Sequence, residues 1–313
     1  MSRILVIKLS SLGDLFHALP AVHLIKQATG ATIDWVTQPE YVELVKCFTD
    51  VDRVIAFPRS SFVAGFPEFE SALKQETYDL VLDMQGLLKS AFVGRLARAK
   101  RRVGPSFSRE GARLFYDAVS GPTNKERHAV EENLDMVRHL GHPAGSVKFP
   151  FRPPVSTLAA PWPRIGVVAC SRWTTKNWPA AHFAEVCKSL LGRKGGIVYL
   201  FGSAGDAAVC SEIEGRVAGN VVNLCGQTSL VETASAMRDL SLVITVDSGP
   251  MHMAAALGIP VLAVFGATDP KRTGPFGAAH RVVTLGGLPC QPCFSRTCIR
   301  PERDTKCLVD LRP

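Results

Sequence analysis

An aspartate near the start of the chain has the residue type and the position of a general base. Asp14 closes the segment Ser10-Ser-Leu-Gly-Asp14, which follows directly on the apolar run Arg3–Lys8. A carboxylate at the end of a strand can take a proton from a substrate hydroxyl. An aspartate in such a turn can equally be a helix cap, and the residues alone leave both roles open. The small residues around it permit a sharp turn, and the N–H groups of a helix that starts there attract anions.

A loop in the second half of the chain carries residues that suit a diphosphate. It runs from Cys170 to Pro179 and contains Ser171, Arg172, Thr174, Thr175 and Lys176. Hydroxyl donors, a planar cation and a point charge at the start of a helix match the charge and the acceptors of a diphosphate. The alternative is a solvated loop in which Trp178 and Pro179 pack at the helix start.

A second loop of this kind follows the apolar run Leu242–Val246. Its residues are Asp247, Ser248, Gly249, Pro250, Met251 and His252. The glycine allows a close backbone approach, and Ser248 with the following N–H groups can hold phosphate oxygens. Asp247 or His252 can bond a substrate hydroxyl or phosphate. A histidine in an apolar helix is usually a core residue, but this one stands one turn after an Asp-Ser-Gly cap.

The elements that must position these loops are short apolar runs separated by helical patterns. The runs are Arg3–Lys8, Thr32–Val36, Asp52–Ala56 and Tyr78–Asp83 in the first half, and Arg164–Val168, Gly196–Phe201, Leu242–Val246 and Pro260–Phe265 in the second. Such runs predict parallel strands buried on both faces, in an α/β fold. A proline-rich stretch divides the chain into residues 1–152, a linker at 153–163, and residues 164–313. We expect two Rossmann-like, doubly wound domains that face a central cleft, with ligands beyond the carboxyl ends of the strands.

Composition and charge bound the location and the partners. The 313 residues are enough for two domains, and the formal net charge of +8 favours acidic partners without choosing among them. The apolar part of the N-terminus is too short for a signal peptide. The segment Ser248–Thr268 has the length of a membrane span, but Gly249-Pro250 and Gly258-Ile-Pro260 break it. It predicts a buried helix followed by a buried strand. With no targeting signal, we expect the protein in the cytoplasm.

Five motifs, taken in order, resemble the heptosyltransferases of glycosyltransferase family 9, which build the inner core of lipopolysaccharide. The motifs are Lys8-x-Ser-Ser-Leu-Gly-Asp14 with Ala18-Leu-Pro20, Asp83-Met-Gln-Gly-Leu-Leu-Lys-Ser90, Thr175-Lys-Asn-Trp-Pro179, Asp247-Ser-Gly-Pro-Met-His252 and Phe265-Gly-Ala-Thr-Asp-Pro270. The second and third look most like heptosyltransferase I, which adds the first heptose to Kdo. The likeness runs from Lys8 to about Asp310.

The resemblance implies a GT-B fold and an inverting sugar transfer that requires no metal. The donor, ADP-heptose, would lie on the C-terminal domain, and the acceptor, Kdo on lipid A, on the N-terminal domain. By position, Asp14 matches the catalytic base, Lys176 matches a lysine that binds the donor diphosphate, and the loop from Asp247 to His252 matches the loop that grips the donor. Ser171 and Arg172 stand where the family usually has a Thr-Thr pair that touches phosphate.

The acceptor side is expected to use two turns of the N-terminal domain. The candidate contacts are Ser10, Ser11, Gly13, Asp83, Gln85, Gly86 and Lys89. For the residues of the second turn, a cap and a solvated helix are equally good interpretations. Downstream lie the basic residues Arg95, Arg98, Lys100, Arg101, Arg102, Arg109 and Arg113. They predict either a solvated helical face and loop or a surface that docks anionic headgroups on the inner face of the membrane.

The chain has nine cysteines, and in a cytoplasmic protein these argue against disulfides. Four of them cluster as Cys290, Cys293, Cys298 and Cys307. One C-x-x-C with two further thiols suits a structural zinc, although the spacing is irregular for a zinc ribbon. The other five are scattered and are expected to be small buried side chains.

Other functions are weighed against the same residues. The predicted strand-to-helix turn at Ser10–Asp14 is neither a Walker A loop nor Gly-x-Gly-x-x-Gly, which argues against an ATPase or an NAD enzyme. A nucleic-acid-binding protein is disfavoured because the chain is only 8% aromatic and shows no RNA- or DNA-binding signature. The alternatives that stay open are heptosyltransferase II, another family 9 transferase with a different acceptor, and a nucleotide-sugar epimerase of GT-B shape.

Overall fold

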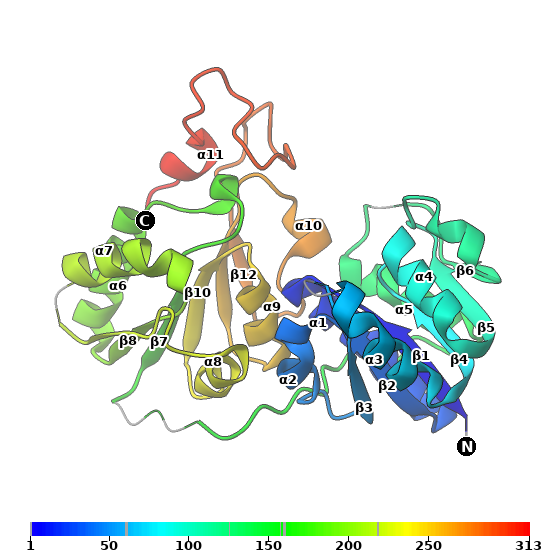
Figure 1. Ribbon diagram of the computed structural model, residues 1–313. Coiled ribbons are helices and arrows are strands. Elements are labelled where there is room, and N and C mark those ends of the chain that lie inside the picture. Colours follow the sequence, from blue (N-terminus) through cyan, green and yellow to red (C-terminus); the bar gives the residue numbers. More distant parts are fainter. Residues whose placement is uncertain (1, 60–61, 125, 157, 159–160, 218) are drawn as a thin grey trace. The chain divides into compact units, whose positions relative to one another are not determined.

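The chain forms two compact units, Met1–Arg152 and Pro153–Pro313, each built on its own sheet (Figure 1). The computed structural model describes residues 2–59, 62–124, 126–156, 158, 161–217 and 219–313. The predicted linker at 153–163 therefore falls partly outside the described residues, at 157, 159 and 160. Among the described helices none is both long and apolar enough to cross a membrane.

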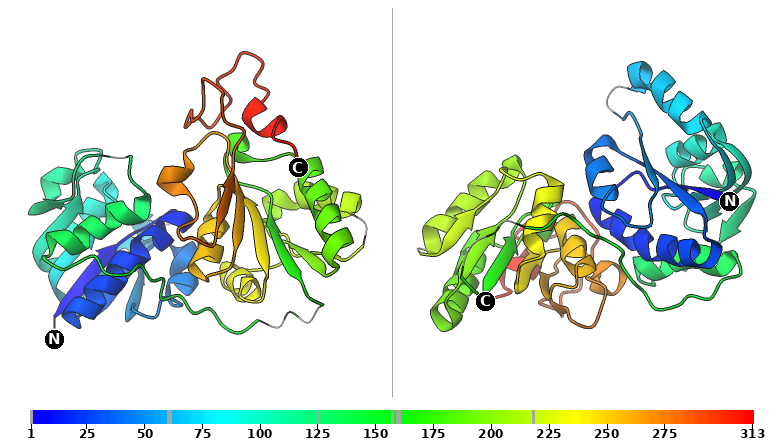
Figure 2. Two further views of the ribbon diagram at one scale, coloured as in Figure 1. Left: turned by 180° about the vertical axis from the view of Figure 1, so that it is seen from behind. Right: turned by 90° about the horizontal axis from the view of Figure 1, so that it is seen from below.

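Unit 1 is a six-stranded parallel sheet in the order β3-β2-β1-β4-β5-β6. Its strands are β1 (Arg3–Ile7), β2 (Thr32–Thr37), β3 (Arg53–Ala56), β4 (Thr77–Asp83), β5 (Arg98–Pro105) and β6 (Ala118–Ser120). Its helices are α1 (Leu12–Thr29), α2 (Val42–Val45), α3 (Phe62–Lys74), α4 (Leu88–Leu96) and α5 (Ala129–His139), with 3-10 turns η1 (Pro39–Tyr41) and η2 (Ala112–Phe115). Helices α1 and α5 pack together on one face of the sheet, and α3 and α4 on the other (Figures 1 and 2).

The strand order of unit 1 reverses at its centre, between β1 and β4. In open α/β sheets this is the point where ligands bind. Strand β1 pairs with both β2 and β4, so that Leu5 lies between Asp34 and Val81 in register. The side chains of Leu5 and Ile7 are fully buried because helices cover both faces. The connection after β1 runs to one side of the sheet centre, toward β2, and the connection after β4 runs to the other side, toward β5. At such a switch point the two connections separate and leave a crevice at the carboxyl ends of the strands.

Unit 2 repeats the design with the order β12-β11-β10-β7-β8-β9. Its strands are β7 (Arg164–Val168), β8 (Ile197–Leu200), β9 (Val221–Asn223), β10 (Leu242–Val246), β11 (Val261–Val264) and β12 (Arg281–Val283). Its helices are α6 (Ala180–Lys194), α7 (Ala207–Val217), α8 (Leu230–Met237), α9 (Gly249–Ala256), α10 (Pro270–Thr273) and α11 (Lys306–Val309), with 3-10 turns η3 (Thr174–Lys176) and η4 (Ala204–Asp206).

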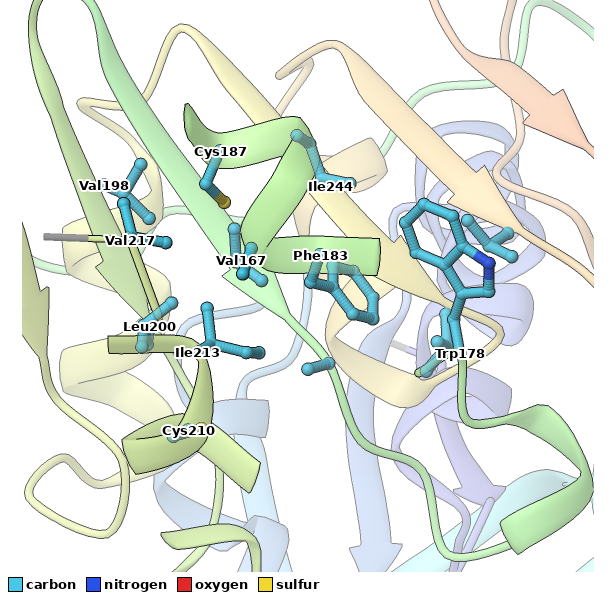
Figure 3. Packing of buried hydrophobic residues seen from close by; sticks show 14 of the residues in the cluster. Val167, Trp178, Phe183, Cys187, Val198, Leu200, Cys210, Ile213, Val217 and Ile244 are labelled. Carbon is cyan, nitrogen blue, oxygen red and sulfur yellow. The ribbon is translucent and has the colours of Figure 1, made fainter. Parts of the chain in front are cut away.

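The core of unit 2 forms where α6 and α7 meet the sheet (Figure 3). Phe183 of α6 and Ile213 of α7 are fully buried beside the strand residue Val167. The C-terminal segment joins this core, because the Trp178 indole Nε1 donates a hydrogen bond to the Leu311 carbonyl at 2.9 Å. Trp178 directly follows the loop that carries Lys176, so the core fixes the position of that loop.

The structure confirms the α/β fold class and the strands predicted from the apolar runs, with ends that differ by one or two residues. It also confirms the buried helix and strand predicted within Ser248–Thr268, which are α9 and β11. Strands β5, β6, β9 and β12 were not predicted from the sequence.

The prediction of a solvated helical face and loop for the basic stretch is wrong over β5. Residues Arg98–Pro105 form a strand whose first half is mostly exposed and whose second half, from Arg102 on, is buried. Arg102 is the reason that a basic run can be a strand. Its buried guanidinium donates to the carbonyls of Gly94, Ala97 and Ala99 at 3.0–3.2 Å. The Gly94 and Ala97 carbonyls lie at the C-terminal end of α4, where the helix lacks its own donors and attracts a cation, and the Ala99 carbonyl belongs to β5 itself.

Replacing Arg102 tests this packing. In Arg102→Ala three carbonyls lose their donor, and we expect the free energy of unfolding to fall by about 2–4 kcal/mol. The matched control is Arg98→Ala, an exposed arginine on the same strand, for which we expect a change within about 0.5 kcal/mol. Urea unfolding followed by circular dichroism measures both. Equal losses in the two variants would contradict the role given to Arg102.

Candidate active site

The β1–α1 turn holds Asp14 at the third residue of helix α1, with Ser11 as the N-cap. One carboxylate oxygen, Oδ2, accepts hydrogen bonds from the Ser11 N–H at 2.8 Å and from the Ser11 hydroxyl at 2.9 Å. The other, Oδ1, lies 3.7 Å from the Nδ1 atom of His17. The Asp14 side chain is 42% exposed. Capping therefore occupies one oxygen, and the carboxylate is still open to a substrate.

A buried lysine controls the charge of this carboxylate. Lys8 is 5% exposed, and its ammonium donates to the Met84 carbonyl at 2.6 Å. Desolvation alone would raise the pKa of Asp14. The charge of Lys8, followed by His17 and the Ser11 N–H, outweighs that effect and holds the pKa well below its ordinary value of 3.8. Asp14 is therefore an ionised carboxylate throughout the neutral range.

The β4–α4 turn supports the loop that carries Asp14. The side-chain carbonyl of Gln85 accepts from the N–H groups of Leu9 and Ser10, each at 3.1 Å. Gly86 has a φ of +73°, and a Cβ atom there would lie 2.8 Å from the Pro105 ring. Only glycine fits this turn without strain. Gln85 thus connects the two sheet-edge turns of unit 1.

Asp83 lies beneath the same turn and is 1% exposed. Its Oδ1 accepts from the N–H groups of Gln85 and Gly86, and its Oδ2 from the hydroxyls of Ser90 and Tyr116, all at 2.6–3.0 Å. Burial outweighs these bonds and raises the pKa of Asp83. The contacts favour the cap interpretation that the sequence left open for this residue. Lys89 is exposed on the first turn of α4.

In unit 2 the two predicted donor loops and the segment after β11 meet around one ion pair. The Lys176 ammonium lies 2.7 Å from Asp247 Oδ2, and the hydroxyl of Thr268 donates to the same oxygen at 2.6 Å. These residues come from η3 and from the segments after β10 and β11. The ammonium also stands 4.6 Å from the ring centre of Trp173, in cation–π contact. The charge of Lys176 is thus held in a defined place by protein groups.

Helix α9 starts beside this ion pair, with Ser248 as its N-cap and Pro250 in its first turn. Ser248 Oγ is 3.2 Å from the hydroxyl of Thr245. Met251 and His252 are buried in the helix. A pocket next to Thr268 is lined by residues that include Asp269, Gly286 and Gln291.

The other predicted donor residues fall into two groups, those whose hydroxyls bond within the protein and those at the start of the loop. Thr175 is buried, and its hydroxyl donates to the Ser295 carbonyl at 2.6 Å, while Thr174 donates to the Arg296 carbonyl at 3.4 Å. These hydroxyls hold the loop to the segment after β12. Arg172 is exposed, and the Ser171 N–H donates to the side chain of Asn177 at 2.7 Å. Phosphate contact by these four residues stays a prediction.

Comparison with known proteins places this arrangement in a family. The family model described as glycosyltransferase family 9 (heptosyltransferase) matches residues 67–303. The chain belongs to this family. It is 31% identical to the lipopolysaccharide heptosyltransferase 1 of Pseudomonas aeruginosa, over 99% of this chain and 91% of that protein.

Solved structures agree with the family over nearly the whole chain. The structure titled E. coli heptosyltransferase WaaC with ADP is 26% identical and covers 98% of this chain and 96% of its own, with a TM-score of 0.79. The E. coli ADP-heptose lipopolysaccharide heptosyltransferase II is 25% identical and covers 99% and 98%, with a TM-score of 0.78. This family 9 glycosyltransferase therefore has the two-unit GT-B fold that the sequence predicted.

Four residues that the structure brings into contact with the candidate site residues received no role from the sequence. Lys8 and Thr268 belonged to recognised motifs and Trp173 to the predicted diphosphate loop, while His17 was not singled out. The signal for Lys8 was available, because a lysine at the end of an apolar strand must find a counter-charge. His17 lies one helical turn after Asp14, on the same face of α1, so its spacing also predicted the contact.

The cysteine-rich segment shows no ready metal site. Cys290, Cys293 and Cys298 are half-buried in a long loop after β12, and Cys307 lies in α11 (Figures 1 and 2). Burial, with the nearby thiols of Cys293, Cys290 and Cys298, raises the pKa of Cys307 to about 11. Within the described ranges no group of three or more histidine, cysteine or acidic side chains is arranged to hold a metal ion. The zinc expectation is not confirmed.

The control of Asp14 by Lys8 can be measured without substrate. In Lys8→Met the largest opposing charge is lost, so we expect the pKa of Asp14 to rise toward its ordinary value. Lys26→Met is the matched control, because Lys26 lowers the pKa of Asp52 instead. Carboxyl-carbon NMR titration should show Asp14 moving in the first variant and Asp52 in the second. An Asp14 titration unchanged in Lys8→Met would refute the electrostatic assignment.

Proposed function

We propose that this protein is an inverting heptosyltransferase that moves heptose from ADP-heptose to Kdo of the lipopolysaccharide inner core. Its family, and relatives named lipopolysaccharide heptosyltransferase, support this reaction. The observation that carries the proposal is the pair of charged sites. Unit 1 offers a carboxylate, Asp14, that is ionised throughout the neutral range, and unit 2 offers a fixed ammonium, Lys176, beside the loops predicted to bind a diphosphate.

On the acceptor side, Asp14 is the base. The attacking Kdo hydroxyl oxygen forms a bond to the anomeric carbon of heptose while its proton passes to the Asp14 carboxylate. A carboxylate with a low pKa is a weak base toward a neutral alcohol. It becomes adequate as the new carbon–oxygen bond forms, since the hydroxyl then turns strongly acidic. Asp14 therefore takes the proton late, and in the ground state it orients the hydroxyl.

On the donor side, Lys176 and the start of α9 receive the leaving group. The bond between the anomeric carbon and the diphosphate oxygen breaks, and its electron pair leaves with ADP on the face opposite the attack. Negative charge grows on the diphosphate, and a fixed ammonium with helix N–H groups stabilises it. An arriving diphosphate takes over Lys176 from Asp247. This frees a carboxylate oxygen of Asp247 to accept a hydrogen bond from a donor hydroxyl.

The acceptor type is the finer part of the proposal. The motif from Asp83 to Ser90 resembles heptosyltransferase I, and the relatives of P. aeruginosa and E. coli named heptosyltransferase 1 are 31% and 30% identical to this chain. A Campylobacter jejuni relative named lipooligosaccharide heptosyltransferase 2 is also 31% identical. We favour Kdo as the acceptor because of the motif from Asp83 to Ser90. We further propose a cytoplasmic protein that contacts the inner membrane, and structural zinc at the four clustered cysteines stays a prediction.

The base assignment has a direct test. Asp14→Asn keeps the shape of the side chain but removes the proton acceptor, so we expect kcat for acceptor-dependent ADP release to fall by about 10²–10⁴-fold. Asp52→Asn, which changes another acid of unit 1, should retain wild-type activity. Release of ADP from ADP-heptose, assayed with and without Kdo-lipid A, gives both numbers. If Asp14→Asn matches wild type, Asp14 is only a helix cap.

The donor assignment is tested by binding alone. Lys176→Gln removes a charged donor to the diphosphate, and we expect the dissociation constant for ADP to rise about 10–100-fold. Lys188→Gln, on the exposed side of α6, serves as the control and should bind ADP as wild type does. Isothermal titration calorimetry measures both variants. Unchanged affinity in Lys176→Gln would remove this lysine from the donor site.

A further inference from the structure

Helix α4 and the turn η2 of unit 1 expose large apolar side chains that the proposed reaction does not use. Leu88 is 44% exposed and Phe92 is 43% exposed, and they lie one helical turn apart on the same face of α4. Leu114 of η2 is 89% exposed. Together these three residues are called the α4–η2 face below. Leucine and phenylalanine at this exposure indicate a contact surface rather than a core.

The two elements of this face are held together by the backbone. The Leu88 N–H donates to the Glu110 carboxylate at 3.2 Å, and the Arg109 N–H donates to the Gly86 carbonyl at 2.8 Å. Helix α4 also packs directly against η2. The inner side of α4, which includes Ala91 and Val93, is buried against the sheet. The apolar side chains are therefore displayed on a rigid support.

Four exposed cations lie on or next to the two elements that carry the α4–η2 face. Lys89 and Arg95 flank the two apolar residues on α4, and Arg109 and Arg113 are exposed at the η2 end. Over the part of the chain that the structure describes, none of these four is assigned an ion pair. The acids nearby are Glu110, whose carboxylate accepts from Leu88, and Asp117, which accepts from the Arg102 N–H. The face therefore keeps a positive balance.

We infer that the α4–η2 face docks on an anionic lipid bilayer, with Leu88, Phe92 and Leu114 entering the headgroup region and the four cations contacting phosphates. Apolar side chains ringed by lysine and arginine on a solvent-exposed helix are the pattern of interfacial membrane binding. Each cation close to an anionic surface strengthens binding about fivefold. Neutral or acidic protein partners lack the dense phosphate layer that these cations match.

The position of the face gives this contact a purpose, which rests on the proposed function. Helix α4 begins immediately after the β4–α4 turn, and Gln85 of that turn holds the loop of Asp14. A bilayer under α4 thus lies beside the edge of unit 1 that carries the base. A lipid-anchored acceptor would then need to raise only its sugar headgroup out of the bilayer to meet Asp14.

Vesicle binding tests the inference directly. Wild type should sediment with vesicles of phosphatidylglycerol and phosphatidylethanolamine, more weakly at high salt, and little with phosphatidylcholine alone. The variant Phe92→Ser/Leu114→Ser should bind about tenfold more weakly. Arg95→Gln/Arg113→Gln should bind about 25-fold more weakly, since two cations are lost. Circular dichroism melts establish that each variant is folded.

Matched controls remove the same groups from unit 2. Val155→Ser/Ile299→Ser takes away two exposed apolar side chains, and Arg193→Gln/Lys194→Gln takes away two exposed cations. Both controls should bind vesicles as wild type does. Vesicle binding that is unchanged in the α4–η2 variants, or that falls as much in the controls, would overturn the inference. So would a wild type that self-associates through this face in sedimentation velocity and ignores vesicles.

Failure of the inference and failure of the proposed function are distinguishable. Transfer to an acceptor stripped of its acyl chains needs no bilayer, so the α4–η2 variants should transfer to it at the wild-type rate. On vesicle-embedded acceptor their rate should fall in proportion to the lost binding. If wild type transfers heptose to neither acceptor, the proposed function fails, and the vesicle-binding result still decides the lipid contact.

Discussion

A lysine ammonium buried at the carboxyl end of β1 is the constraint on which the rest of unit 1 depends. Removing such a charge from water is costly unless an opposite charge and hydrogen-bond acceptors lie close by. Lys8 has the Met84 carbonyl as an acceptor, and its own backbone is fixed by bonds to Val36 and Trp35. Its charge acts on the carboxylate of Asp14. The turn that presents this aspartate, and the Gln85 bonds that hold the turn, therefore serve folding and, in the proposed reaction, chemistry.

Each unit has a lysine and an aspartate at its candidate site, but the two units bury them differently. In unit 1 the ammonium is buried and the carboxylate of Asp14 is exposed, so the substrate meets an anion. In unit 2 Lys176 and Asp247 are 16% and 6% exposed and neutralise each other. A diphosphate can displace the carboxylate because it carries more charge and more acceptor oxygens. In the reaction that we propose, one unit thus supplies a proton acceptor, and the other supplies a cation that is held in place until the leaving group arrives.

Sequence patterns predicted the strands that contain a run of buried apolar residues and missed those that are very short or mostly polar, such as the three-residue strands β6, β9 and β12. Strands β1, β4, β7 and β10 each end in a run of buried residues because helices cover the sheets on both faces. Strand β5 was missed because its first half carries exposed basic residues and only its second half is buried. Asp14 and Lys176 could be selected from motifs. The inward-facing bonds of Asp83 and Gln85 could not, because composition does not tell whether a polar side chain serves the backbone or a substrate.

The central claim is that the charge of Lys8 keeps Asp14 ready to accept the acceptor's proton. It is tested most directly by the pH dependence of kcat/KM for sugar transfer, measured side by side in wild type and Lys8→Met. Since Lys8 lowers the pKa of Asp14, the acid limb of the profile should move to higher pH in the variant, with the plateau at higher pH retained in shape. Profiles whose acid limbs coincide would show that Asp14 is not the group titrating in the reaction, and would contradict the account.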